Sequence, residues 1–172
     1  NPVELVSLTH SNPPEARGEH VTTLFGSKLI VYGGLGYGAL YDVWELDLSV
    51  TPLQWTQITT TGSTPVGYNS AGVQYGSKLV IFGGKVSGTY YKDVWELDLT
   101  ANTKQWVELN PSNVPPAGGE APTAVLYGTK MIVYGGYYGG YGDEAWELDL
   151  SNPTIWVQLS VASSQSLPTR PT

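Results

Sequence analysis

The chain contains no cysteine and only two histidines, and these absences exclude several kinds of chemistry. Without cysteine there is no disulfide framework, no thiolate nucleophile and no thiolate metal ligand. With His10 and His20 alone, no histidine-rich metal motif is present. The sequence also lacks a nucleophile elbow and a phosphate-binding Gly-x-Gly-x-x-Gly between a strand and a helix. We therefore expect no catalytic residue, no metal and no cofactor, and we predict that the chain is not an enzyme.

Basic residues are scarce as well. Eight Lys and Arg residues stand against fifteen Asp and Glu, which gives a net charge of −7 and argues against nucleic acid or an anionic membrane surface as a partner. No apolar run approaches the length of a membrane span. The low lysine content beside abundant Tyr, Thr, Ser and Gly favours a secreted or cell-surface protein, with the cytoplasm as the alternative. The sequence contains no Asn-x-Ser/Thr acceptor site, so N-glycosylation gives no support for secretion.

The most informative feature that is present is a repeat. The string Trp-Glu-Leu-Asp-Leu occurs at Trp44–Leu48, Trp95–Leu99 and Trp146–Leu150, 51 residues apart each time. Double glycines and a second tryptophan keep the same phase: Gly33-Gly34, Gly83-Gly84 and Gly135-Gly136, then Trp55, Trp106 and Trp156. One structural unit is therefore present in three copies.

Each unit contains four short apolar runs that are predicted to be strands, here called A to D. In the first unit they are Val21–Phe25, Leu29–Tyr32, Val43–Leu48 and Trp55–Ile58. The runs are rich in Val, Ile, Tyr, Trp and Thr, and Gly, Pro, Ser or Asp residues bound them. None has the length that a helical period needs. Four antiparallel strands copied at this spacing predict an all-β fold made of β-propeller blades.

The unit resembles the kelch repeat in its double glycine after an apolar strand, its aspartate-bearing strand and its spaced tryptophan. Pro14, Arg17 and His20 also match the family's Pro-x-x-Arg-x-x-His pattern at the start of the innermost strand. Units two and three depart from that pattern, since they have Gly67 and Gly119 for Arg17, and Ser70 and Pro122 for His20. The resemblance implies a kelch propeller with blades at residues 13–61, 62–113 and 114–160.

The two ends of the chain are expected to belong to neighbouring blades. Pro2–Leu8 aligns with a D strand, which makes it the orphan outer strand of a preceding blade within residues 1–12. In residues 161–172, Leu167-Pro168-Thr169-Arg170 resembles the start of a following blade. Propellers usually close with about four to eight blades. We therefore expect a second copy, or the rest of a longer chain, to complete the ring.

The connections between strands B and C are the candidate recognition loops, because they differ between units while the A–B turns are nearly identical. They span Leu35–Tyr41, Lys85–Lys92 and Tyr137–Asp143. Tyr and Gly together are typical of recognition surfaces, where rigid rings lie beside adaptable backbone. The alternative is that the rings pack on neighbouring blades. The candidate ligand-binding tyrosines are Tyr37, Tyr41, Tyr90, Tyr91, Tyr137, Tyr138 and Tyr141.

The D–A connections should emerge at the same end of the blades as the B–C loops. In kelch proteins an arginine at the position of Arg17 often reaches a ligand, so the resemblance implies Arg17 as an anchor. The alternative is that Arg17 ties its loop to backbone carbonyls or to Glu15. Tyr68, Asn69 and Glu120 occupy corresponding positions and are further candidates, whereas His20 is predicted to be structural.

The repeated Glu-x-Asp pairs are predicted to be structural, because each pair lies on a separate blade and the pairs cannot converge on one ion. Their aspartates are expected to accept backbone hydrogen bonds at the C–D turn. The pairs are Glu45/Asp47, Glu96/Asp98 and Glu147/Asp149.

These observations predict a non-catalytic binding scaffold that recognises a protein or a glycan through its Tyr/Gly-rich loops. Two alternatives remain open. The repeats could assemble into a ring or filament through open blade faces. The chain could also be part of a galactose-oxidase-like or other kelch enzyme whose catalytic residues lie outside this segment.

Overall fold

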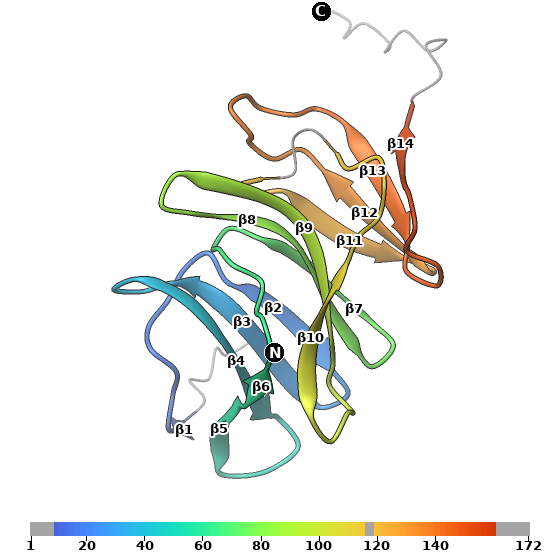
Figure 1. Ribbon diagram of the computed structural model, residues 1–172. Helices are drawn as coiled ribbons and strands as arrows, with labels where there is room; N and C mark the ends of the chain where they lie inside the picture. The colour runs from blue at the N-terminus through green and yellow to red at the C-terminus, as the bar shows by residue number, and fades with distance from the viewer. Residues whose placement is uncertain (1–8, 116–118, 161–172) are drawn as a thin grey trace, which may run out of the picture.

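The computed structural model describes residues 9–115 and 119–160. The predicted orphan strand Pro2–Leu8 and the segment 161–172 lie outside these residues. The described chain forms three β-sheets stacked like a fan, with blade 1 at the bottom of Figure 1 and blade 3 at the top.

Each sheet contains four consecutive antiparallel strands, which confirms the all-β propeller fold. Blade 1 consists of β2 (Val21–Phe25), β3 (Lys28–Leu35), β4 (Ala39–Asp47) and β5 (Leu53–Ile58). Blade 2 consists of β7 (Ala71–Tyr75), β8 (Lys78–Val86), β9 (Thr89–Asp98) and β10 (Lys104–Leu109). Blade 3 consists of β11 (Thr123–Tyr127), β12 (Lys130–Tyr134), β13 (Ala145–Asp149) and β14 (Trp156–Leu159). The innermost strands β2, β7 and β11 pack against one another in order.

A short parallel strand extends the outer edge of blades 1 and 2, a feature that the sequence did not predict. β1 (His10–Ser11) pairs with β5, and β6 (Thr60–Thr61) pairs with β10. Blade 3 has a parallel bridge at the same place, between Ser112 and Ile155. Thr60 and Thr61 belong to the first repeat unit by sequence but pair with the second sheet. Each blade is thus covered at its outer edge by the segment that precedes it.

The B–C hairpins of blades 1 and 2 are longer than the sequence predicted. β3 and β8 continue through the double glycines, where the register with the next strand shifts by a bulge. Tyr41, Tyr90 and Tyr91 therefore lie on β4 and β9 instead of in loops, so the prediction of long loops was wrong for these two blades. In blade 3 the strands end at Tyr134 and begin again at Ala145, and the loop between them is present as predicted.

The core lies between the blades, where aromatic side chains pack across each junction. The ring centroids of Tyr32 and Trp106 are 5.0 Å apart between blades 1 and 2. Those of Phe82 and Trp156 are also 5.0 Å apart between blades 2 and 3. In both cases the D-strand tryptophan of one blade packs on the aromatic residue that precedes the double glycine of the blade before it. The repeated tryptophans therefore join the blades.

The Glu-x-Asp pairs have structural roles, as predicted. Asp47 Oδ1 accepts hydrogen bonds from the backbone N and the Oγ of Ser49, and Asp98 and Asp149 do the same in the other blades. These hydrogen bonds hold the pKa of each aspartate below its ordinary value. The glutamates form ion pairs across to strand B, which the sequence analysis missed: Lys28–Glu45, Lys78–Glu96 and Lys130–Glu147.

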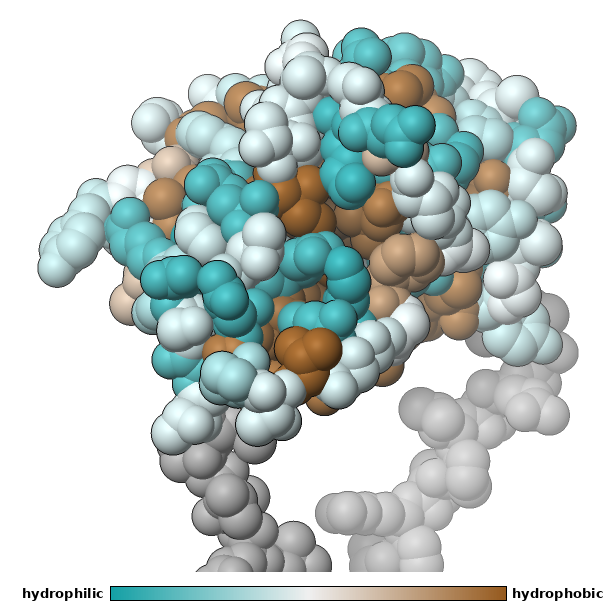
Figure 2. Space-filling view, turned by 90° about the horizontal axis from the view of Figure 1, so that it is seen from below, coloured by the Kyte–Doolittle hydropathy of each residue, from teal (hydrophilic) through white to brown (hydrophobic). Residues whose placement is uncertain are grey.

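Two blade faces are not covered by another blade of the described chain. On blade 3, Val125, Tyr134 and Leu159 are exposed, although the equivalent side chains of blade 2 are buried (Val73 and Phe82) or partly buried (Leu109) against blade 3. Figure 2 shows the molecule from below, where blade 1 lies, and there hydrophobic residues occupy a hollow bordered by hydrophilic ones. No helix that could span a membrane occurs in the described ranges.

Candidate functional site

The D–A segments and the B–C hairpins meet at one end of the blades, as predicted. In each blade one residue of the D–A segment forms a backbone bridge with the residue after the double glycine. The bridges are Gly18–Leu35, Tyr68–Lys85 and Glu120–Tyr137, with N···O distances of 2.8–3.0 Å. The hairpin tips lie on the left in Figure 1, and the A–B turns lie on the opposite side.

Successive D–A segments are also joined to one another near the innermost strands. The backbone N of Asn69 donates to Glu19 O at 3.0 Å, and the N of Ala121 donates to Asn69 O at 2.8 Å. All three residues have positive φ, between 53° and 58°. Asn tolerates this conformation better than most residues do. Asn69 therefore has a backbone role, and its side-chain Nδ2 also donates to Glu120 Oε1 at 3.3 Å.

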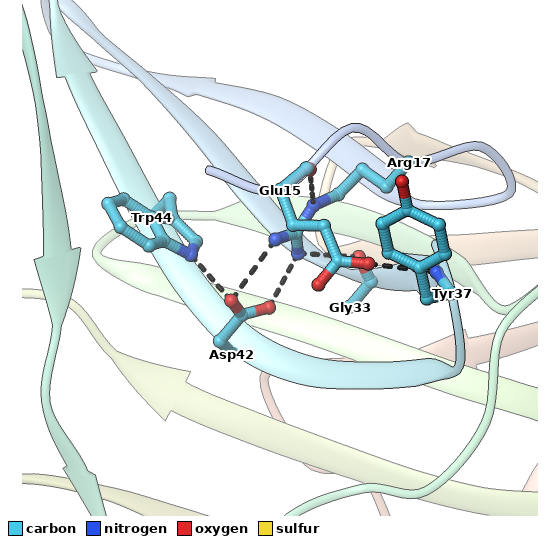
Figure 3. A network of polar contacts seen from close by, with 6 residues as sticks. All are labelled: Glu15, Arg17, Gly33, Tyr37, Asp42 and Trp44. Atoms are coloured by element: carbon cyan, nitrogen blue, oxygen red, sulfur yellow. Dashed lines mark hydrogen bonds and ion pairs between the residues drawn. The ribbon is translucent and has the colours of Figure 1, made fainter. Parts of the chain in front are cut away.

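Arg17 is engaged within blade 1 (Figure 3). Its NH1 and NH2 groups donate to the two oxygens of Asp42 at 2.5 and 3.1 Å, and NH1 also donates to Gly33 O at 3.0 Å. Its Nε donates to Glu15 O at 3.0 Å, and the side chain is only 4% exposed. The contacts with the carbonyl oxygens of Gly33 and Glu15 are of the kind that the structural alternative named, whereas the contact with the Asp42 carboxylate was not predicted.

The carboxylate two residues before the first tryptophan accepts the indole N–H in every blade, a repeated contact that the sequence analysis missed. Trp44 donates to Asp42 at 2.6 Å, Trp95 donates to Asp93, and Trp146 donates to Glu144 at 3.1 Å. Among the described residues no arginine lies beside Asp93, because Gly67 stands in the position of Arg17.

The two aspartates consequently have pKa values shifted in opposite directions. Burial opposes ionisation of Asp42, but hydrogen bonds from Arg17 and Trp44 and the Arg17 charge outweigh it and lower the pKa of Asp42. For Asp93, burial dominates and raises the pKa above its ordinary value, against the hydrogen bond from Trp95. Ionised Asp42 therefore stabilises the fold, and ionised Asp93 destabilises it.

Asparagine substitutions should separate these effects. We expect Asp42→Asn to lower the free energy of unfolding at pH 7 by about 1–3 kcal/mol, because Arg17 loses its charged acceptor. Asp93→Asn should raise it by about 0.5–1 kcal/mol, because the amide oxygen still accepts the indole N–H without a buried charge. Urea denaturation of both variants and the unsubstituted chain measures these differences.

The pH dependence of the free energy of unfolding provides a control for both substitutions. The stability that Asp42 contributes is present above its unfolded pKa of about 3.9 and is lost as pH falls through its lower folded pKa. The penalty at Asp93 is absent below about pH 3.9 and appears as pH rises through its raised folded pKa. Equal effects of the two substitutions at pH 7 would contradict these assignments.

A cleft with aromatic walls lies where blades 2 and 3 meet and has a volume of about 580 Å³. The Tyr137 ring is edge-on to Tyr90 and to Tyr141, with centroids 5.6 and 5.2 Å apart, and Tyr138 packs on Tyr90 at 5.7 Å. Tyr141 is 93% exposed, so its ring borders the opening. Gly135, Gly136 and Gly142 supply backbone to the wall. The cleft forms where the blade 3 hairpin ends early and its glycine-rich loop approaches blade 2.

A carboxylate with defined partners lies at the wall of this cleft. Glu120 Oε2 accepts from Lys85 Nζ at 2.9 Å, and Glu120 Oε1 accepts from Asn69 Nδ2 at 3.3 Å. The hydrogen bond to Glu120 raises the pKa of Lys85, so its amine stays protonated. Lys85 Nζ also lies 5.4 Å from the centroid of the Tyr90 ring, and Lys92 Nζ lies 3.7 Å from that of Tyr138. The site thus combines tyrosine rings with cations held against them.

The sequence analysis missed Lys85 and Lys92. Both lysines were treated only as the ends of a predicted loop. Lys85 is the residue after the double glycine in blade 2, and the equivalent residues are Leu35 in blade 1 and Tyr137 in blade 3. That divergence between units was the available signal, because all three positions form the bridge to the D–A segment.

The structure brings together only part of the predicted site. Tyr90, Tyr137, Tyr138, Tyr141, Asn69 and Glu120 gather at the blade 2–3 junction. Tyr37 and Tyr41 belong to blade 1; Tyr37 is fully exposed, and its backbone N donates to Glu15 Oε1 at 2.8 Å. Tyr68 contributes its backbone bridge to Lys85, and Tyr91 pairs with Gly84 inside the hairpin. No group of three or more His, Asp or Glu side chains suited to a metal occurs in the described residues.

Comparison with known protein families agrees with this geometry. The KLHDC2/KLHL20/DRC7 Kelch-repeats domain model matches residues 4–171. The chain belongs to the kelch-repeat family. This kelch chain is 36% identical to Adagio protein 3 of Arabidopsis thaliana over 129 residues, which cover 73% of the chain and 21% of that relative. It is 35% identical to Adagio-like protein 1 of Oryza sativa subsp. japonica, again over 73% of the chain and 20% of the relative.

A solved structure shares the kelch chain's fold. The structure titled "Structure of YjhT" superposes with a TM-score of 0.70 over 90% of the chain and 53% of that structure, at 16% identity. The kelch chain spans about a fifth of the length of the two Adagio relatives. Kelch-repeat domains are typical of interaction and scaffold modules.

Proposed function

We propose that this kelch chain is a non-catalytic module that recognises a partner protein through the end of the blades where the B–C hairpins and D–A segments meet. The observation that carries the proposal is the cleft of about 580 Å³ at the blade 2–3 junction, which is lined by Tyr90, Tyr134, Tyr137 and Tyr141. Tyrosine supplies large, rigid contact area at low conformational entropy cost, and it is enriched at interfaces.

The ionisable groups of the cleft are suited to binding and poorly suited to catalysis. Lys85 and Glu120 neutralise each other, and the raised pKa of Lys85 keeps it from acting as a base near neutral pH. A general acid or base works best when its pKa is near the working pH. Binding through ring contacts and hydrogen bonds requires no such group.

Photo-crosslinking tests where the partner binds. We expect a photoreactive phenylalanine analogue at Tyr141 to form crosslinks with a protein from an extract of the source cells. The matched control carries the same analogue at Tyr127, which is 77% exposed but lies at the A–B turn at the other end of the blades. Mass spectrometry identifies the crosslinked protein and residue. Equal crosslinking from both positions, or crosslinking from Tyr127 alone, would contradict the proposed face.

A further inference from the structure

We infer that the cleft at the blade 2–3 junction receives a basic side chain, an arginine or a lysine, from an exposed segment of the partner protein. This inference rests on the proposed function and names the chemistry that the site recognises. Three observations support it: the excess of negative charge at this end of the blades, the lysines that already lie over tyrosine rings, and the unused hydrogen-bond acceptor positions of Glu120.

Carboxylates outnumber cations at this end of the described blades. Arg17, Lys85 and Lys92 are the basic residues, and the acidic residues are Glu15, Glu19, Asp42, Asp93, Glu120, Asp143 and Glu144. The whole chain carries a net charge of −7. Such a surface attracts cationic segments and speeds their association, and it disfavours acidic ones.

The chain itself shows that its tyrosines hold cations. Lys92 Nζ lies 3.7 Å from the Tyr138 centroid, and Lys85 Nζ lies 5.4 Å from the Tyr90 centroid. Among the described residues, no lysine or arginine lies over Tyr137 or Tyr141, and Tyr141 is almost fully exposed. A cation–π contact becomes stronger as the cation is desolvated. The two rings can therefore take a cation from outside.

Glu120 supplies the countercharge. A carboxylate offers about four acceptor positions, and Glu120 accepts one hydrogen bond from Lys85 and one from Asn69. Arg17 and Asp42 show in blade 1 how this chain holds a guanidinium, with two parallel hydrogen bonds to one carboxylate. A partner arginine that binds Glu120 in this way would compete with Lys85, whose single ammonium binds one oxygen.

Substitutions of Glu120 and Lys85 provide the test, because removing each charge should change the affinity for a basic peptide in opposite directions. The probe is a fluorescent Gly/Ser peptide with three arginines, and its control is the same peptide with three citrullines, which are nearly isosteric and uncharged. Fluorescence anisotropy should show at least about tenfold tighter binding of the arginine peptide, which corresponds to about 1.4 kcal/mol. Raising the salt concentration should weaken that binding.

We expect Glu120→Gln to weaken binding of the arginine peptide by about tenfold and Lys85→Met to strengthen it several-fold. Tyr141→Ala should also weaken binding, and this exposed residue can be replaced without unfolding the chain. Equal affinity for the arginine and citrulline peptides would overturn the inference. So would Glu120→Gln and Lys85→Met variants that change binding in the same direction. Salt-independent binding of a neutral oligosaccharide such as maltohexaose, without binding of the arginine peptide, would assign the cleft to a glycan instead.

Failure here is distinguishable from failure of the proposed function. Crosslinking from Tyr141 without preference for the arginine peptide would leave the binding face in place and reject a basic ligand. Absence of both would reject the two proposals together.

Discussion

Replacing Trp156 by alanine is expected to lower the free energy of unfolding by about 3–5 kcal/mol, which is the range for removing a large aromatic residue from a core. Trp156 has 0% exposure and packs on Phe82 of the preceding blade, with ring centroids 5.0 Å apart. The substitution removes an aromatic contact between two sheets as well as buried apolar area. Because each blade shares its core with its neighbour, we expect one cooperative loss of structure in urea, monitored by circular dichroism at several wavelengths.

The repeat provides an internal control for this prediction. Trp55 occupies the equivalent position in blade 1, but no blade of the described chain covers it and it is only partly buried. Its ring contacts His10 edge-on at 6.3 Å. Trp55→Ala should therefore destabilise the chain clearly less than Trp156→Ala. If the two variants lost equal stability, the tryptophans would act within their own blades, and the account of blade-to-blade packing would be wrong.

The second large effect is expected at the double glycine. Gly34 has φ of 109°, and a Cβ added there would lie 2.6 Å from the carbonyl oxygen of Gly18. This oxygen accepts the bridge hydrogen bond from Leu35 N, so it has little freedom to move away. Gly34→Ala should lower the free energy of unfolding by about 2–4 kcal/mol, from backbone strain and the displaced bridge together.

Gly38→Ala is the matched control, since its Cβ would meet nothing within 4 Å and its φ is not positive. We expect it to change stability by less than about 0.5 kcal/mol. Thermal unfolding of the two variants side by side gives the comparison. A stable Gly34→Ala variant with an intact hairpin would show that the D–A segment is not held by close backbone approach.

The strand order and the three blades of the described chain could be predicted from the sequence because the physical signals are local and repeated. Each apolar run is short, turn residues bound it, and every unit repeats it in the same phase. The paired glycines were recognised only as landmarks. Their reason is non-local, since Gly34 faces Gly18 and Gly84 faces the Tyr68 segment across a bridge. No pattern within a single strand contains that contact.

The site was predictable in part for a similar reason. Strand parity placed the hairpins and D–A segments at one end, and glycine-rich composition marked the loop at Tyr137. The lengths of the first two hairpins were mispredicted, because the double glycine was taken as the end of a strand and is a bulge within it. The lysines at positions 85 and 92 were missed because their partners are on other elements: Glu120 on a D–A segment and Tyr138 in the next blade.

The parallel edge strands have a consequence for how such a chain can be cut and rejoined. Thr60 and Thr61 satisfy backbone groups on the outer edge of β10, and a bare edge of this kind is a template for intermolecular pairing. A fragment that starts at Ala71 would carry all four strands of the second sheet with that flank uncapped. A module meant for transfer to another chain should therefore begin at Thr60, so that it includes the short strand that covers the edge of β10. The boundary of the folded unit thus lies about ten residues before its first long strand, within the sequence of the preceding repeat.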